Sequence, residues 1–452
     1  MKQFWKTGLV LLVLIGLGAY MWFVERKRPD ADDKPKEKAV TLDKAKAREI
    51  VLARAGGEEI RLVRQGDAWR MTAPQDVPAD ASAVDAILGS LESLDAEEVV
   101  TESATDVAQF GLEPPRVAVT VTLEDAGPAR LHLGGKTPDE GALYARIPDR
   151  PRVFTVAGYL EGSFDKQPFD LRDRDVLHVK RDAVTRLAAT GDPGPFTLVR
   201  DARGEWAFAA PVSTRAGRWT VDGLLGTLEG LRMEKVVSET PAAGDLKAWG
   251  LDPPARTVTV TLADGVTRTL EIGAADADKK RYARVAGVPL VVLIPPALAD
   301  DLAKGMAEYR AKRLLDVATY EVQAIEVETP AGKRAYQRSS VKDKDGVDSY
   351  TWKRTAPDAK DVATSAVQDL LFEVGGVEAL EFVDRPQAPA AYGLEAPAVK
   401  VTLRHDTEQK PPVWFALGRR DGAVYARRMD DEAVLKLDPA KAEGLIKKLG
   451  EL

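Results

Sequence analysis

The residues that most often carry enzyme chemistry are scarce in this chain. Its 452 residues include three histidines and no cysteine, which excludes disulfides, thiolate metal sites, a cysteine nucleophile and a lipidated cysteine anchor. The histidines fall at unlike places in a repeating pattern: His132 at an outward strand position, His178 in an entry strand and His405 at a turn. Residues so placed do not predict a metal site or a Ser/His/acid triad.

Two motifs resemble ligand-binding loops but lack the residues that such loops need. Asp343-Lys-Asp-Gly346 matches part of a calcium loop, yet Val341 would take the first ligand position and Trp352 that of the bidentate glutamate. We interpret it as an enlarged hairpin tip. Gly134-Gly135 lacks the Lys-Ser/Thr of a phosphate loop and predicts a turn. We therefore predict no catalytic, cofactor-binding or metal-binding residues, and no cofactor.

An arginine and an acid recur together in three parts of the chain, which suggests an ion pair. We expect each arginine to reach the acid, or a backbone carbonyl, of its own copy. The alternative is a solvated arginine on a strand. The arginines are Arg146, Arg284 and Arg427, and the acids are Glu113, Asp252 and Glu395.

These acids belong to a phrase of the type aromatic-Gly-Leu-acid-x-Pro that occurs three times. Each glycine is expected to adopt a positive φ, and the prolines after it favour an extended chain. The strand that follows alternates apolar and polar residues, which is typical of an antiparallel sheet covered on one side. The recurring glycines of the phrase are Gly111, Gly250 and Gly393.

Each phrase is preceded by a Trp-x-x-x-x-Pro segment, called here the tryptophan entry, and then by a helix. The apolar residues of the three helices share the spacing i, i+3, i+4, i+7, i+10, which predicts one helix face packed on a sheet. Asp80 is expected to cap the first helix. The tryptophans are interpreted as core residues of a hairpin, with exposed stacking platforms as the alternative. They are Trp69, Trp206 and Trp352.

The sequence thus predicts an α+β protein: three tandem copies of a mainly antiparallel sheet-plus-helix domain after one N-terminal transmembrane helix. The length suits about three domains of roughly 150 residues each. The net charge of −7 argues against a general nucleic-acid binder. The expected segments are a cytoplasmic tail (1–6), a transmembrane anchor (7–24), a charged linker (25–40) and repeat domains at 41–170, 171–313 and 314–452.

The predicted anchor is uncharged from Thr7 to Val24. At about 1.5 Å per residue it spans about 27 Å, close to the hydrocarbon thickness of a bilayer. A cleaved signal peptide and a buried helix are the alternatives, but no small-residue cleavage site follows the apolar run. Positive charges flank both ends, and those after the span mildly oppose an outward-facing body. Because long domains cross membranes despite such counts, we expect the bulk of the chain in the periplasm.

Each recurring arginine ends a Tyr-Ala-Arg sequence on a predicted strand, and each recurring tryptophan begins a Trp-x-x-x-x-Pro segment. With the Gly-Leu-acid-x-Pro phrases and the N-terminal anchor, these features resemble the bacterial family of domain of unknown function 4340. The likeness covers nearly all of the chain past residue 40. It implies an envelope protein encoded beside ABC-transporter parts of the gliding-motility type. It implies no activity and no site residues.

Three functions of different classes are compatible with these features. The first is a non-catalytic scaffold or accessory subunit, anchored in inner-membrane lipid by Thr7 to Val24, whose partner is an ABC-transporter permease or another envelope protein. The second is a module that binds glycan or peptidoglycan, which requires an exposed aromatic row with Trp219 or Trp414. The third is an uncharacterised enzyme, which requires a deep pocket with convergent polar groups in one copy.

Overall fold

A computed structural model describes residues 37–202, 204–315, 318–342, 348–405, 412–429 and 431–451. The predicted tail, the predicted anchor and most of the charged linker lie outside these residues, as does the tip at 343–347. Within the part of the chain that is described, no helix is long and apolar enough to cross a membrane.

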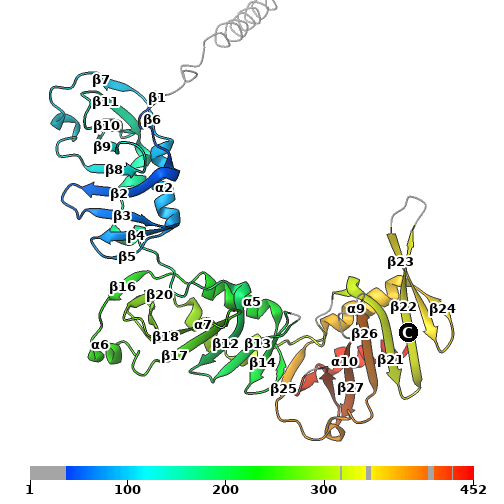
Figure 1. Cartoon of the computed structure of the whole chain (residues 1–452). Coiled ribbons are helices and arrows are strands. Elements are labelled where there is room, and N and C mark those ends of the chain that lie inside the picture. The colour runs from blue at the N-terminus through cyan, green and yellow to red at the C-terminus, as the bar shows by residue number, and fades with distance from the viewer. Residues whose placement is uncertain are drawn as a thin grey trace, which may run out of the picture. The chain divides into compact units, whose positions relative to one another are not determined.

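The chain folds into three tandem α+β repeats, each built on a nine-stranded antiparallel sheet (Figure 1). The strand orders are β5-β4-β3-β2-β8-β9-β10-β11-β7, β15-β14-β13-β12-β17-β18-β19-β20-β16 and β24-β23-β22-β21-β26-β27-β28-β29-β25. The three orders are the same when each strand is named by its place in its own repeat. The predicted tandem α+β fold is therefore confirmed. Repeat 1 forms one compact unit that ends at Arg174, and repeats 2 and 3 form a second unit that begins at Asp175.

Repeat 1 opens with a short strand and closes with short helices. Its elements are β1 (Glu37–Lys38), η2 (Lys44–Lys46), β2 (Ala47–Arg54), β3 (Ile60–Gln65), β4 (Ala68–Ala73), β5 (Val77–Pro78), α2 (Ala81–Glu92), β6 (Asp95–Ala96), β7 (Val99–Thr101), η3 (Ala108–Phe110), β8 (Val117–Leu123), β9 (Ala129–Lys136), β10 (Ala142–Arg146), β11 (Val153–Ala157), η4 (Gly158–Leu160), α3 (Glu161–Phe164) and α4 (Pro168–Leu171).

Repeat 2 repeats this order with a short helix before its phrase. Its elements are η5 (Arg181–Ala183), β12 (Val184–Thr190), β13 (Phe196–Arg200), β14 (Trp206–Ala210), β15 (Thr214–Arg215), α5 (Arg218–Glu229), β16 (Lys235–Ser238), α6 (Ala243–Ala248), β17 (Arg256–Leu262), β18 (Thr267–Ala275), β19 (Arg281–Val285), β20 (Val291–Ile294), α7 (Ala297–Ala303) and α8 (Met306–Tyr309).

Repeat 3 has a longer hairpin between the second and third strands of its sheet and ends in one longer helix. Its elements are η6 (Thr319–Glu321), β21 (Val322–Thr329), β22 (Gly332–Lys342), β23 (Asp348–Ala356), β24 (Lys360–Val362), α9 (Thr364–Gly376), β25 (Ala379–Val383), η7 (Pro389–Tyr392), β26 (Val399–His405), β27 (Val413–Arg420), β28 (Ala423–Arg428), β29 (Val434–Leu437) and α10 (Pro439–Glu451).

The long helix of each repeat buries the face that its spacing predicts. In α2 the buried residues are Val84, Ile87, Leu88 and Leu91, and the matching residues of α5 and α9 are buried too. The Asp80 side chain accepts hydrogen bonds from the first-turn amides of α2, so the expected N-cap is confirmed. In repeats 1 and 3 the helix packs with the inward strand residues in a main core, which is the main source of stability.

The second half of the sheet is covered on both faces, which the alternating pattern did not predict. In repeat 1, Leu143 and Ala145 of β10 face the main core, whereas Tyr144 packs with Phe110 and Leu112 on the opposite face. The phrase is therefore itself a covering layer. Repeat 3 has the same small second cluster around Leu394.

Each repeat is entered by a segment that pairs with the chain after its long helix. In repeat 1, β1 pairs with β6, so the end of the predicted linker belongs to the pairing of this repeat. In repeats 2 and 3 the same place is taken by bridges from Asp175 to Arg232 and from Arg313 to Glu378. The entry segments are thus held by backbone pairing.

Candidate functional site

The phrase contacts the sheet through glycine on both sides. Gly111 has a φ of 67° and Gly250 and Gly393 have φ of 67° and 66°, as predicted. A Cβ on Gly134 of β9 would lie 2.2 Å from the carbonyl oxygen of Phe110, and one on Gly273 of β18 would lie 2.1 Å from that of Trp249. Both glycines lie within their strands rather than at the strand ends. They let the backbone of the phrase lie directly on the sheet.

The aromatic residue that begins each phrase packs on the tyrosine of the Tyr-Ala-Arg strand. The ring centroids of Phe110 and Tyr144 are 5.0 Å apart, and those of Trp249 and Tyr282 are stacked at 5.6 Å. Tyr392 and Tyr425 form the third pair, at 5.1 Å. Sequence reasoning missed this contact, although the recurrence of both aromatic positions was a usable signal. The pairs fasten the phrase to its sheet.

The expected pairing of the recurring arginines with the acids of the phrase is not found. Among the ion pairs of the described residues, none joins such an arginine to the phrase acid of its own repeat, and Arg284 pairs with Glu271 instead. The strand register explains this, because each arginine lies opposite a residue of the preceding strand and not opposite the acid of the phrase. The opposed pairs are Arg146 with His132, Arg284 with Glu271 and Arg427 with Ala416. The acids Glu113, Asp252 and Glu395 are exposed.

His132 therefore lies beside a positive charge in repeat 1. Burial lowers the pKa of its imidazole, and the charges of Arg146 and Arg130 lower it further. The imidazole is thus favoured in its neutral form. Nowhere in the described ranges does a cluster of three or more histidines, aspartates or glutamates offer a metal site.

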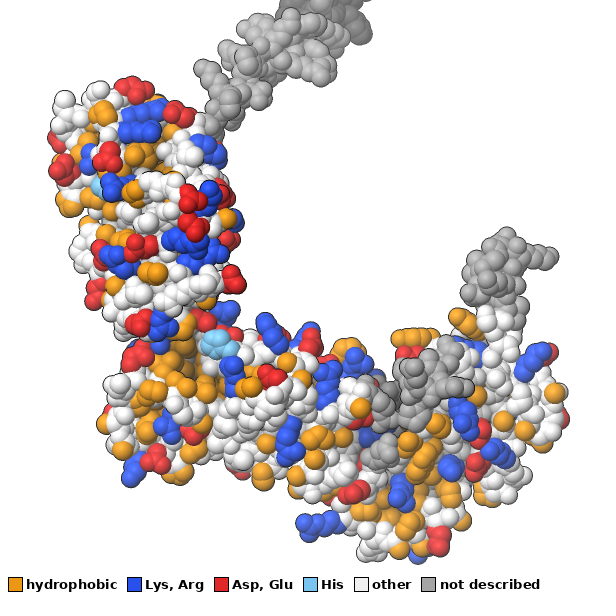
Figure 2. Space-filling view, viewed as in Figure 1, with side chains coloured by type: hydrophobic (Ala, Val, Ile, Leu, Met, Phe, Trp, Pro, Cys, Tyr) orange, Lys and Arg blue, Asp and Glu red, His pale blue; other side chains and the backbone are white. Residues whose placement is uncertain are grey.

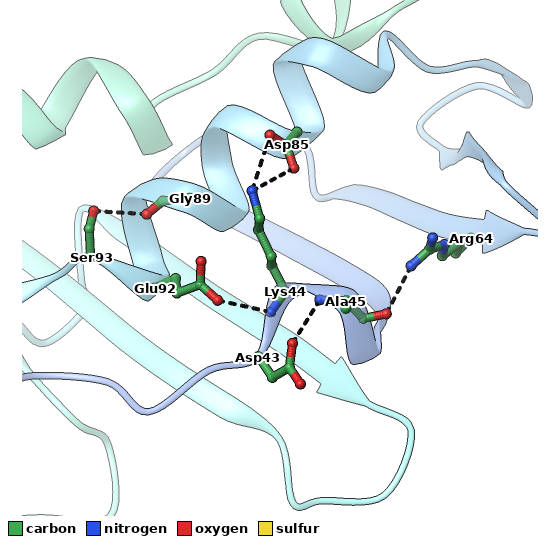
Figure 3. Close-up of polar contacts among 8 residues, drawn as sticks. All are labelled: Asp43, Lys44, Ala45, Arg64, Asp85, Gly89, Glu92 and Ser93. Atoms are coloured by element: carbon green, nitrogen blue, oxygen red, sulfur yellow. Dashed lines mark hydrogen bonds and ion pairs between the residues drawn. The ribbon is translucent and has the colours of Figure 1, made fainter.

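A second recurring arginine, which sequence reasoning also missed, supports the turn before each first strand. The guanidinium of Arg64 donates to the carbonyl of Ala45, at 3.0 Å (Figure 3). Arg200 donates to Asp182 at 3.2 Å and Arg338 to Tyr320 at 2.6 Å. We call these three residues the turn-supporting arginines. Their acceptors are backbone carbonyls, which leave no side-chain signature in the sequence.

The contact between this turn and the long helix differs among the repeats. In repeat 1, the Lys44 ammonium lies 3.2 Å from the Asp85 carboxylate, and the Lys44 amide donates to Glu92 (Figure 3). In repeat 2, Lys180 and Arg181 lie 3.5 Å and 3.9 Å from Glu229. The contact in these two repeats is ionic.

In repeat 3 the same region carries two exposed aromatic residues. Tyr320 is the second residue of the turn, where repeat 1 has Ala45, and it is 74% exposed. Phe372 follows Val367 in α9 as Gly89 follows Val84 in α2, and it is 79% exposed. This part of repeat 3 therefore presents aromatic side chains where repeat 1 has alanine and glycine.

The tryptophans separate into buried and exposed positions. Trp69, Trp206 and Trp352 are 8%, 5% and 3% exposed, which favours their interpretation as core residues. Trp219, at the start of α5, is 75% exposed. Trp414 is half-buried, and the Lys400 ammonium lies 5.7 Å from its ring centroid. On the face drawn in Figure 2, acidic and basic side chains are interspersed and hydrophobic side chains surface in several places.

Repeats 2 and 3 are tied together by two buried arginines. Arg428, which is 1% exposed, donates to the carbonyls of Ala311 and Arg313 at 2.7 Å and 2.6 Å and pairs with Asp431. Arg310, which is 6% exposed, lies 2.5 Å from Asp384. Burial of a paired charge gives a contact that is costly to break and specific in geometry.

A comparison with family models matches three segments of the chain. The matches to the domain of unknown function DUF4340 cover residues 69–216, 206–397 and 352–452. They begin at Trp69, Trp206 and Trp352, the recurring tryptophans. Comparisons with curated proteins and with solved structures found no match. Since the matched segments cover most of its length, the chain belongs to the DUF4340 family of domains of unknown function.

Proposed function

We propose that this chain is a membrane-anchored, extracytoplasmic scaffold or accessory protein of the cell envelope, without catalytic activity. Its partners would be an ABC-transporter permease or another envelope protein, and its anchor the apolar segment from Thr7 to Val24 in the inner membrane. The observation that carries the proposal is that the residues recurring in every repeat serve the fold. Glycines, aromatic pairs and turn-supporting arginines all hold the same fold in each copy, and the copies differ on their surfaces.

The contact between repeats 2 and 3 supports the same proposal. A scaffold needs domains whose surfaces keep a set relation to each other. For two of the three repeats this is supplied by the bonds of Arg428 to the connecting segment and by the pair of Arg310 with Asp384. The exposed aromatic residues Tyr320 and Phe372 are of the kind enriched in protein interfaces. They give repeat 3 a surface that the other repeats lack at that place.

The test is crosslinking of the full chain in membranes, followed by affinity purification through a C-terminal tag. Recovery of transporter permease subunits would support the accessory role, and recovery of soluble cytosolic proteins alone would contradict it. A matched control replaces Thr7 to Val24 with an unrelated transmembrane segment and should recover the same partners. A periplasm-dependent reporter fused after Leu452 should be active, and an inactive reporter would contradict the topology.

A second candidate function is binding of envelope glycan, and the exposure of Trp219 favours it. Full-length protein in detergent would be sedimented with purified peptidoglycan. Trp219→Ala should abolish sedimentation, whereas Tyr159→Ala, a change at an equally exposed aromatic residue of repeat 1, should not. Sedimentation that is unaffected by Trp219→Ala would remove the support for this function.

A further inference from the structure

A small hollow that opens to solvent lies between repeats 2 and 3 and is lined by four arginines. Arg215 and Arg218 come from repeat 2, Arg313 from the segment that enters repeat 3, and Arg428 from β28. Of the described residues that line it, Glu205 is the one acid. Arginine side chains that converge on a small space are typical of oxyanion recognition, because the planar guanidinium donates two parallel hydrogen bonds.

Three of these arginines have donors to spare. The Arg215 guanidinium takes part in none of the hydrogen bonds or ion pairs found among the described residues. Arg218 comes no closer than 4.0 Å to Asp222, and Arg313 no closer than 3.7 Å to Glu378. Their charges are thus weakly compensated within the protein.

The fourth arginine is fixed and supplies a buried positive charge behind the hollow. Arg428 is held by Asp431 and by two backbone carbonyls. Burial lowers the pKa of its guanidinium, and the nearby charges of Arg215 and Arg310 lower it further while Asp431 acts in the opposite direction. An anion in the hollow would relieve this repulsion among like charges.

Comparison with repeat 1 shows that the start of α5, beside the hollow, lacks a capping carboxylate. The α2 helix carries its own anion, because the Asp80 carboxylate accepts from the amides of Ser82 and Ala83 at 2.9 Å and 3.2 Å. At the N-cap of α5 stands Gly217, which has no side chain to do this, and the first turn of α5 has no acid. The flanking residues are the arginines of the hollow, where repeat 1 has Pro78 and Ala81. The positive end of α5 thus adds to their field.

We propose that this hollow binds a phosphate group, held by Arg215, Arg218 and Arg313 with Arg428 as the fixed charge behind it. The group belongs to free phosphate or to a phosphorylated compound such as a lipid headgroup, which share this chemistry. Because the donors come from both sides of the contact, binding would stabilise repeats 2 and 3 against separation. The proposal does not depend on the scaffold function proposed above.

The experiment measures binding of inorganic phosphate to the full chain in detergent by calorimetry and by thermal unfolding, with chloride at equal ionic strength as reference. We expect saturable binding and a rise in Tm that chloride does not give. Arg215→Gln and Arg218→Gln should each weaken binding about tenfold, the loss of one charged hydrogen-bonding group. Arg186→Gln, at an exposed arginine of β12, is the matched control and should leave binding unchanged.

Arg215→Lys keeps the positive charge and provides a further test in case the other variants fail to fold. It should unfold as the natural chain does without phosphate and still bind phosphate less tightly. Glycerophosphate and vesicles of phosphatidylglycerol, run beside inorganic phosphate, distinguish the sources, and tighter binding of any one supports the site. No response beyond that of chloride, or equal binding by the Arg215→Gln/Arg218→Gln double variant, would overturn it.

Discussion

Repeats 1 and 3 have the same strand order but differ at the residue that follows Tyr-Ala-Arg. In repeat 1 it is Ile147, which packs against the apolar core. In repeat 3 it is Arg428, which is buried and binds the segment arriving from repeat 2. The two residues occupy matching positions after β10 and on β28, but one contacts the core and the other contacts a segment from the neighbouring repeat. The comparison teaches that recurring residues hold the fold, whereas residues that differ lie where one copy meets something else.

The turn beside the long helix likewise has one contact that all repeats share and another that differs among them. In all three repeats an arginine supports the turn from the second strand. The surface around the turn is copy-specific, because Lys44 pairs with Asp85 of the helix in repeat 1 and Tyr320 is exposed in repeat 3. The shared contact is internal to the fold, and the variable one is at the surface.

The largest effect is expected from Arg428→Met. The change leaves the Asp431 carboxylate and two linker carbonyls buried without their partner, which should lower the free energy of unfolding by about 3–5 kcal/mol. Denaturant unfolding of the full chain, followed by tryptophan fluorescence, measures this loss. Ile147→Met at the matching position of repeat 1 is the control and should cost less than about 1.5 kcal/mol. Equal losses in the two repeats would break the comparison.

A smaller effect is expected from Gly273→Ala, at a position that recurs in every repeat. The added methyl would overlap the carbonyl oxygen of Trp249 and should cost about 1–3 kcal/mol. Gly226→Ala is the control, because a Cβ there meets no atom within 4 Å and alanine favours the α5 helix. That change should raise stability by up to about 1 kcal/mol. If both changes have the same sign, the close approach is not what selects glycine.

Loss of a turn-supporting arginine should cost about 1 kcal/mol, since one charged hydrogen bond to a carbonyl is removed near the surface. Arg64→Gln in repeat 1 and Arg338→Gln in repeat 3 should both speed hydrogen exchange of the adjacent turn. Exchange in the untouched repeat is the internal control. If only one of the two variants speeds exchange in its own repeat, the support is copy-specific, contrary to the comparison.

The smallest effect is expected from Lys44→Ala. Its ion pair with Asp85 is exposed, with side chains 42% and 66% accessible, so the loss should be within about 0.5 kcal/mol and should vanish in high salt. Denaturant midpoints at low and high ionic strength measure it, with Lys38→Ala, at another exposed pair, as the reference. A loss that persists in high salt would indicate that the lysine packs rather than pairs.

Much of the fold was predictable, because its signals are local. The helix faces follow from a spacing that Val84 to Leu91 display within three turns, and the positive φ of Gly111 follows from residue type and neighbours. The pairing of Arg146 with Glu113 was predicted from recurrence. It is not found because the register of β9 and β10 sets the arginine opposite His132. Recurrence shows that a residue matters to a repeat, but not what it contacts.

The sequence by itself determined that there are three copies of one α+β unit and which side chains of each helix are buried, since periodicity and repetition can be read along the chain. Only the tertiary structure decided what lies between distant segments. It set the rings of Phe110 and Tyr144 together, the guanidinium of Arg64 on a backbone carbonyl, and Arg428 with Arg215 around one hollow. These contacts depend on strand register and on linker path. Both arise from the packing of whole domains rather than from any local pattern.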